Sequence, residues 1–131
     1  MDKKPAQYSP LSLAYLGDSV YELYVRSRVI SENPEMPAHK LHLKTVQYVK
    51  AHAQSNSMKC LEPILSEEEQ AIYKRGRNAK SATVPKNADL TDYRRATGFE
   101  ALIGYIKLKN DAERLEELMQ LAYASAEKEH E

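Results

Sequence analysis

The chain has 131 residues, 42% of them hydrophobic, which suits one domain (residues 1–131) built around a single core. No apolar run reaches the ~18 residues of a membrane span, and the first residues lack the apolar stretch of a signal peptide, so we expect a cytoplasmic protein. A single cysteine, Cys60, excludes an internal disulfide and a metal-thiolate pair. Basic and acidic residues number 19 each, so net charge alone argues against a nucleic-acid binder.

The first predicted helix runs from about Pro10 to Glu32. Ser9 and Pro10 are favoured residues for an N-cap and a first helical position. Apolar residues then form two stripes on opposite sides, which amphipathic surface helices do not show. One stripe holds Leu13, Leu16, Val20 and Leu23, and the other holds Leu11, Ala14, Val25 and Val29. We therefore expect a central, buried helix that also contributes to a dimer interface.

The middle of the chain predicts two helical segments and a loop. Asn33 and Pro34 end the first helix, and a second helical region runs from Pro37 to about Leu61 with a break near residues 51–57. Its expected core residues include Leu41, Val46 and Val49. Ser66 and Glu69 have the spacing of a capping box, which predicts a short helix to about Arg75. Residues 76–88 show no apolar period, contain Pro85 and are basic, which indicates an exposed loop.

Two helices complete the predicted chain. Asp89 or Thr91 can cap a helix that ends near Asn110, and a last helix runs from about Ala112 to Lys128. The core face of the first of these comprises Phe99, Leu102, Ile103 and Ile106. Because no alternating β-branched run appears, the sequence predicts an all-α fold.

Charge is unevenly distributed along the chain. Residues 74–95 carry seven basic side chains against Asp89 and Asp92, whereas residues 111–131 carry seven acids against Arg114 and Lys128. The basic segment fits a phosphate-contacting arm, because lysine and arginine neutralise a nucleic-acid backbone while asparagine and serine add hydrogen bonds. The candidate RNA-binding residues are Arg75, Arg77, Asn78, Lys80, Ser81, Lys86, Asn87 and Arg94.

Asp18 lies in LAYLGDSVYE, on an apolar side of the first helix. An unpaired charge there is costly, so the carboxylate needs a partner, and a metal ion is one candidate. The alternative is that Gly17 interrupts the chain and Asp18 caps a helix starting at Ser19.

Glu100 lies in RRATGFEALIGYI, on one side of a helix with Thr97 and Gly104. Glycine inside a helix is unfavourable, so Gly98 and Gly104 suggest close approach by another helix or a ligand. The alternative is an exposed glutamate beside helix-packing glycines.

Other titratable residues are weaker candidates. His39 and His42 have the spacing of metal ligands on one helix face, but no third ligand matches, so we expect them to face solvent. Glu113, Glu116 and Glu117 lie in a strongly charged segment that a solvated helix face explains.

Together, LAYLGDSVYE, RGRNAKS and TGFEALIGY resemble the ribonuclease III catalytic domain, in the right order and spacing. The stretch from Lys74 to Tyr105 is most similar to the short bacterial branch called Mini-ribonuclease III. The resemblance covers about Leu11 to Leu118. It implies that Asp18 and Glu100 are catalytic, metal-binding residues. Larger members have two further acids, where this chain has Ala14 and Thr97, so the number of metal ions and their ligands stay open.

The resemblance also implies an all-helical homodimer in which each subunit cleaves one strand of double-stranded RNA with Mg²⁺, giving 5′-phosphate and 3′-hydroxyl ends. It implies a role in maturing the 23S ribosomal RNA precursor, assisted by a large-subunit ribosomal protein. It implies a catalytic domain without a separate double-stranded-RNA-binding domain.

Two other functions stay open at this point. A non-catalytic RNA-binding or ribosome-assembly factor on the same fold would explain the absent acids at Ala14 and Thr97. An all-helical nucleotide pyrophosphohydrolase could instead use Glu22, Glu100 and Glu113, although the basic segment is longer than a small nucleotide needs.

Overall fold

The computed structural model describes residues 3–80, 84–86 and 88–129, and every regular element within these ranges is a helix. In chain order the elements are η1 (Pro5–Gln7), α1 (Pro10–Glu32), α2 (Ala38–Val49), α3 (Ala51–Leu61), η2 (Glu62–Ile64), α4 (Glu67–Asn78), α5 (Leu90–Leu108) and α6 (Ala112–Glu129). The predicted all-α class is therefore confirmed. None of the described helices combines the length and apolar character that crossing a membrane requires.

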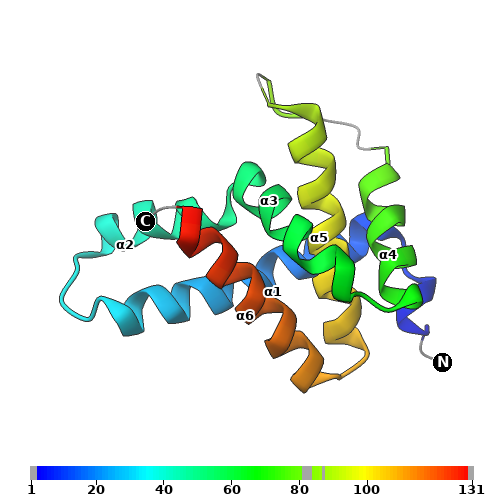
Figure 1. Cartoon of the computed structure of the whole chain (residues 1–131), viewed down its shortest axis with the longest axis horizontal. Coiled ribbons are helices and arrows are strands. Elements are labelled where there is room, and N and C mark those ends of the chain that lie inside the picture. Colours follow the sequence, from blue (N-terminus) through cyan, green and yellow to red (C-terminus); the bar gives the residue numbers. More distant parts are fainter. Residues whose placement is uncertain (1–2, 81–83, 87, 130–131) are drawn as a thin grey trace.

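Helix α5 is the central element of the fold. It crosses α1, runs beside α4 and packs against α3, while α6 covers the other side of α3 (Figure 1). Its residues 101–106 are all buried, because neighbours cover every side of the helix. The predicted core face is confirmed, since Phe99, Leu102, Ile103 and Ile106 are at most 1% exposed.

Helix α1 buries one face, not two. The buried residues are Leu13, Ala14, Gly17, Tyr21, Val25 and Val29, which draw on both predicted stripes. Tyr21 lies at the centre of the buried face, where its ring packs edge-on against Phe99 of α5 with ring centroids 4.8 Å apart. The opposite face leaves Tyr15, Leu23 and Ile30 exposed, and Leu11 in the first turn is exposed as well. The expectation of a helix buried on both sides is thus wrong within one chain, and its role in a dimer stays a prediction.

The boundary between α2 and α3 lies earlier than predicted. The break is at Lys50, whose extended backbone separates two helices, and residues 51–57 are helical. The buried residues of α2 are Thr45 and Tyr48, whereas the predicted core residues Leu41, Val46 and Val49 are only partly buried. Tyr48 is buried because its ring stacks on that of Tyr123 of α6, and the two ring centroids are 4.2 Å apart.

Helix α4 begins at the predicted capping box and ends three residues later than predicted. The Ser66 hydroxyl accepts a hydrogen bond from the Glu69 backbone N–H at 3.1 Å, and the Glu69 carboxylate accepts one from the Ser66 N–H at 2.9 Å. The helix continues through Gly76 to Asn78. Packing against α5 accounts for the extension, since a Cβ at Gly76 would lie 2.7 Å from the Ala101 Cβ.

Candidate active site

Asp18 and Glu100 come together where α1 crosses α5. The Ser9 side chain accepts a hydrogen bond from the Ser12 N–H at 3.1 Å, so α1 begins at Pro10 and continues without interruption to Glu32. Asp18 is therefore inside a helix, and the alternative that it caps a helix starting at Ser19 is wrong. Glu100 lies in the middle of α5.

Two glycines allow the helices to approach this closely. A Cβ at Gly17 would overlap the backbone carbonyl of Glu100, and a Cβ at Gly104 would overlap the carbonyl of Leu13. The two backbones are thus in direct contact beside the carboxylates. The expectation of close approach at Gly104 is confirmed, and Gly98 likewise packs against Tyr73 of α4, with a Cβ there 2.7 Å from the ring.

The environment of Glu100 disfavours its ionised form. Burial, and next the negative charge of Asp18 together with a hydrogen bond to it, raise the pKa of Glu100 from 4.5 to about 8. Asp18 itself is exposed, so the pair combines one solvated and one partly buried carboxyl group. The alternative of an exposed Glu100 is wrong. A strongly perturbed carboxyl beside a second one is typical of functional sites.

The sequence did not point to Gln54, which also lies at this site. Its side chain is 2% exposed and forms a hydrogen bond with Glu100 that opposes the rise in pKa. A glutamine within the polar sequence AHAQSNSM looks like a surface residue. Only the packing of α3 against α5 identifies it as buried.

The paired carboxylates fit a divalent cation. A cation between Asp18 and Glu100 would offset the repulsion that holds a proton on Glu100. Carboxylate and amide oxygens are hard ligands that suit Mg²⁺, which retains several waters when bound to one or two carboxylates. The described residues hold no group of three His, Cys, Asp or Glu placed to bind a metal, so water and substrate phosphate would complete the coordination.

The positions of the two absent family acids are filled by side chains with other roles. Ala14 is 7% exposed and packs in the core. The Thr97 hydroxyl donates to the Tyr93 carbonyl of its own helix at 3.0 Å. Neither residue brings a further negative charge to the carboxylate pair.

The glutamates of the pyrophosphohydrolase alternative lie apart. Glu22 accepts a hydrogen bond from the Arg26 Nε on the same helix at 3.1 Å, and Glu113 is an exposed residue in the first turn of α6. The metal-ligand set that this alternative requires does not assemble among the described residues.

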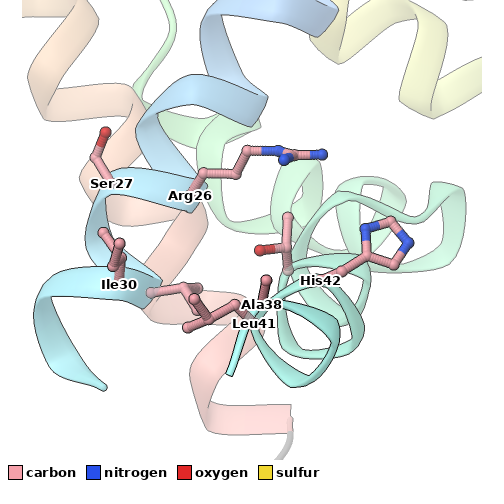
Figure 2. A pocket seen from close by; sticks show the side chains of 8 residues that line it. Arg26, Ser27, Ile30, Ala38, Leu41 and His42 are labelled. Atoms are coloured by element: carbon pink, nitrogen blue, oxygen red, sulfur yellow. The ribbon is translucent and has the colours of Figure 1, made fainter. Parts of the chain in front are cut away.

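His39 and His42 are exposed on α2, as expected. His42 lines a surface pocket of about 290 Å³ between α1 and α2, together with Arg26, Ile30 and Leu41 (Figure 2). The carboxylate pair does not line this pocket.

The candidate RNA-binding residues surround the segment that joins α4 to α5. Arg77 lies over the Tyr73 ring, 5.7 Å from its centroid, and donates to the Asn78 side chain at 3.2 Å. Lys80, Lys86 and Arg94 are exposed. Because α4 and α5 lie side by side, these cations share one end of the helix pair (Figure 1). Ser81 and Asn87 lie outside the described residues.

Arg75 differs from the other cations. Its guanidinium donates to the backbone carbonyls of Ala6 at 2.9 Å and Tyr8 at 3.2 Å. It therefore ties the segment before α1 to α4. An arginine has five N–H donors, so this contact leaves others for a phosphate.

This all-helical fold is that of the ribonuclease III class. The family model for the ribonuclease III domain matches residues 11–111. The chain belongs to the ribonuclease III family, in its Mini-ribonuclease III branch.

Relatives and a solved structure agree with this assignment. A Mini-ribonuclease 3 from Clostridium tetani is 54% identical over 115 residues, which are 88% of this chain and 76% of the relative. A Mini-ribonuclease 3 from Brevibacillus brevis is 46% identical over 129 residues, which are 98% of this chain and 96% of the relative. The crystal structure of a Fusobacterium nucleatum protein superimposes with a TM-score of 0.81 at 31% identity, covering 92% of this chain and 95% of the other. The chain is therefore an endoribonuclease.

Proposed function

We propose that this protein cleaves double-stranded RNA with Mg²⁺ bound by Asp18 and Glu100. The observation that carries the proposal is the contact of these two carboxyl groups at a glycine-lined crossing. A bound Mg²⁺ ion supplies Lewis acidity that activates water and offsets charge developing on the scissile phosphate. Asp18 and Glu100 would hold this ion. Attack of water on phosphorus with cleavage of the P–O3′ bond, the O3′ leaving group taking up a proton, would leave 5′-phosphate and 3′-hydroxyl ends.

Four cations where α4 ends and α5 begins support a duplex RNA substrate. Arg77, Lys80, Lys86 and Arg94 present positive charge at the end of α4 and the beginning of α5. Phosphate contacts of this kind position a protein on the regular backbone of A-form RNA without reading its sequence. Ser81, Asn87, Arg75 and Asn78 complete the proposed RNA-binding set.

A homodimer would bring two carboxylate pairs to the two RNA strands. The exposed apolar face of α1, with Tyr15 82% and Leu23 68% exposed, supports an interface there. Exposed apolar patches of this kind mark interaction sites. We further propose that the substrate is a stem of the 23S ribosomal RNA precursor in the cytoplasm, assisted by a large-subunit ribosomal protein. These last assignments rest on the resemblance to the Mini-ribonuclease III branch.

The test is cleavage of a long double-stranded RNA by wild type, Asp18→Asn and Glu100→Gln, in Mg²⁺ and in EDTA. We expect metal-dependent cleavage by wild type and its loss in both variants. Glu116→Gln, an exposed carboxylate on α6, is the matched control and should cleave normally. Binding of RNA by wild type without cleavage would favour the non-catalytic RNA-binding factor, which the absence of acids at Ala14 and Thr97 motivates.

A further inference from the structure

Gln54 is a buried amide that the core does not explain. It lies on α3 with 2% of its surface exposed, and its Oε1 has no hydrogen-bond partner within the described residues. Burying an amide oxygen without a partner costs free energy. Such an atom in a folded protein calls for an explanation, which can be a ligand or water that completes its hydrogen bonding.

The neighbours of Gln54 place this atom beside the carboxylate pair. The amide of Gln54 hydrogen-bonds to Glu100 and stabilises its ionised form, as an N–H donor to a carboxylate does. Other buried hydroxyls also lack partners, including that of Tyr21. Tyr21, however, has Tyr24, Tyr48 and Arg28 as its electrostatic neighbours, not the two carboxyl groups.

Helix α3 holds the amide on a rigid support. Ser57, one turn further on, is buried and donates to the Ala122 carbonyl of α6 at 3.0 Å. Met58 and Leu61 on the same helix are fully buried. The position of Gln54 is therefore fixed from both α5 and α6, as a residue that orients another side chain requires.

We propose that Gln54 is a positioning residue of the active site, whose amide N–H holds the Glu100 carboxylate in its metal-binding orientation. Its Oε1 belongs to the same planar amide, so it stays next to the site as an acceptor for water of a hydrated cation. The inference rests on the proposed function. In this way a neutral side chain on α3 contributes where Ala14 and Thr97 supply no acid.

The reason for such a residue is the flexibility of glutamate. Fixing its rotatable bonds costs conformational entropy, and a carboxylate that is already oriented does not lose this entropy when the cation binds. Removing a side chain that orients a metal ligand typically weakens metal binding by about 10- to 100-fold. Gln54 should therefore affect metal affinity without touching the RNA.

The first test measures Mn²⁺ binding by calorimetry without RNA, on wild type, Gln54→Met and Gln70→Met. Methionine keeps the length and removes both hydrogen-bonding atoms. We expect Mn²⁺ affinity to fall by about 10-fold or more in Gln54→Met. Gln70→Met is the control, because it makes the same change at a partly buried glutamine of α4, whose amide donates to the Leu65 carbonyl at 3.4 Å. It should bind Mn²⁺ like wild type.

Cleavage kinetics separate positioning from RNA binding. In Gln54→Met, kcat should fall at saturating RNA while KM stays within about twofold of wild type. Equal Mn²⁺ affinity and equal kcat in a folded Gln54→Met would overturn the inference but leave the proposed function intact. A wild type that neither binds Mn²⁺ nor cleaves RNA would overturn both.

A measurement on wild type avoids any dependence on the folding of the variant. The side-chain amide resonances of Gln54 should shift when Mg²⁺ is added without RNA. Those of Gln70, a partly buried glutamine on α4 bonded to the Leu65 carbonyl, should stay in place. Gln54 resonances that do not respond to Mg²⁺ would overturn the inference.

Discussion

Gly17 and Gly104 lie backbone against backbone where α1 crosses α5. A Cβ at Gly17 would lie 2.8 Å from the Gly104 nitrogen, and a Cβ at Gly104 would lie 3.1 Å from the Gly17 nitrogen. Each glycine is next to, or one turn from, a carboxylate of the proposed active site. The helix contact and the geometry of the proposed catalytic pair therefore depend on the same two residues.

Replacing Gly104 with alanine should push the two helices apart. Because the new methyl group meets backbone atoms that cannot rotate away, we expect a loss of roughly 3 kcal/mol or more in the free energy of unfolding. Urea denaturation measures this loss. Ser19→Ala, an exposed change on α1, should alter the free energy by less than about 0.5 kcal/mol. Equal stability of Gly104→Ala and wild type would contradict the close crossing.

The metal-free protein should become less stable as pH rises from about 5 to about 8. In this window folded Glu100, with a pKa of about 8, keeps a proton that the unfolded chain, with a pKa near 4.5, releases. Glu100→Gln should remove this pH dependence. At about pH 9 its free energy of unfolding should exceed that of wild type by on the order of 2 kcal/mol. Urea denaturation in EDTA at several pH values measures the free energy of unfolding of both proteins. Parallel plots of this free energy against pH would refute the raised pKa of Glu100.

Asp18→Asn should lower the pKa of Glu100 without returning it to 4.5. The charge of Asp18 is the second cause of the shift, and burial, the first, is unchanged. Carbon-13 NMR of the Glu100 carboxyl group measures the pKa directly. Glu22→Gln on the same helix, whose carboxylate pairs with Arg26, serves as the control and should leave Glu100 unaffected. An unchanged pKa in Asp18→Asn would mean that the two carboxyl groups are apart.

Arg77 and Lys80 should contribute to RNA affinity through phosphate contacts. Replacing both with alanine should weaken binding and reduce the slope of log affinity against log salt by up to about 2, one unit per lost contact. Fluorescence anisotropy at several salt concentrations measures this slope. Lys59→Ala, an exposed lysine on α3, is the control. An unchanged slope in the double variant would show that this segment does not contact RNA.

Arg114 should matter for stability more than the exposed ion pairs do. Its guanidinium donates to both Glu69 carboxylate oxygens at 2.7 and 2.9 Å and to the Ile64 carbonyl at 2.8 Å. Arg114→Ala leaves the buried Glu69 unpaired, so we expect a loss of about 2–3 kcal/mol by thermal or urea denaturation. Arg26→Ala, which breaks an exposed pair, should cost less than about 1 kcal/mol. Similar losses in the two variants would contradict the assigned role.

The exposed face of α1 should form a dimer. Tyr15→Glu and Leu23→Glu should shift the protein toward monomers in sedimentation velocity experiments, because each places a charge in an apolar contact. Leu121→Glu on α6 is the control and should leave the dimer intact. A stable wild-type monomer at micromolar concentration would refute the dimer.

The sequence predicted best where local pattern and packing agree. The core face of α5 followed from apolar spacing, and the start of α4 followed from Ser66 and Glu69, because both signals are local. The prediction of which residues of α1 are buried was wrong in part. Leu23 is apolar and lies in a predicted stripe but is exposed, whereas Gly17 is buried against the backbone of α5. Which stripe is covered depends on where the other helices lie.

The site was predictable only in part for the same reason. Asp18 and Glu100 were identified by their motifs and by the cost of a charge on an apolar face. Gln54 was missed because its neighbours in sequence are polar, and its burial arises from contacts with residues more than forty positions away. Arg75 looked like a free cation, but its bonds to Ala6 and Tyr8 arise only in the folded chain.

The contact between Gly17 and Gly104 also determines how the enzyme can be engineered. Main-chain atoms meet at this contact, so we expect the spacing of Asp18 and Glu100 to depend little on side-chain rotamers elsewhere in the core. We therefore expect libraries that repack the residues around Tyr48 and Tyr123, or stabilise the outer surface of α6, to preserve the spacing of the proposed catalytic pair. Thermostability and catalytic geometry can then be optimised in separate rounds of selection.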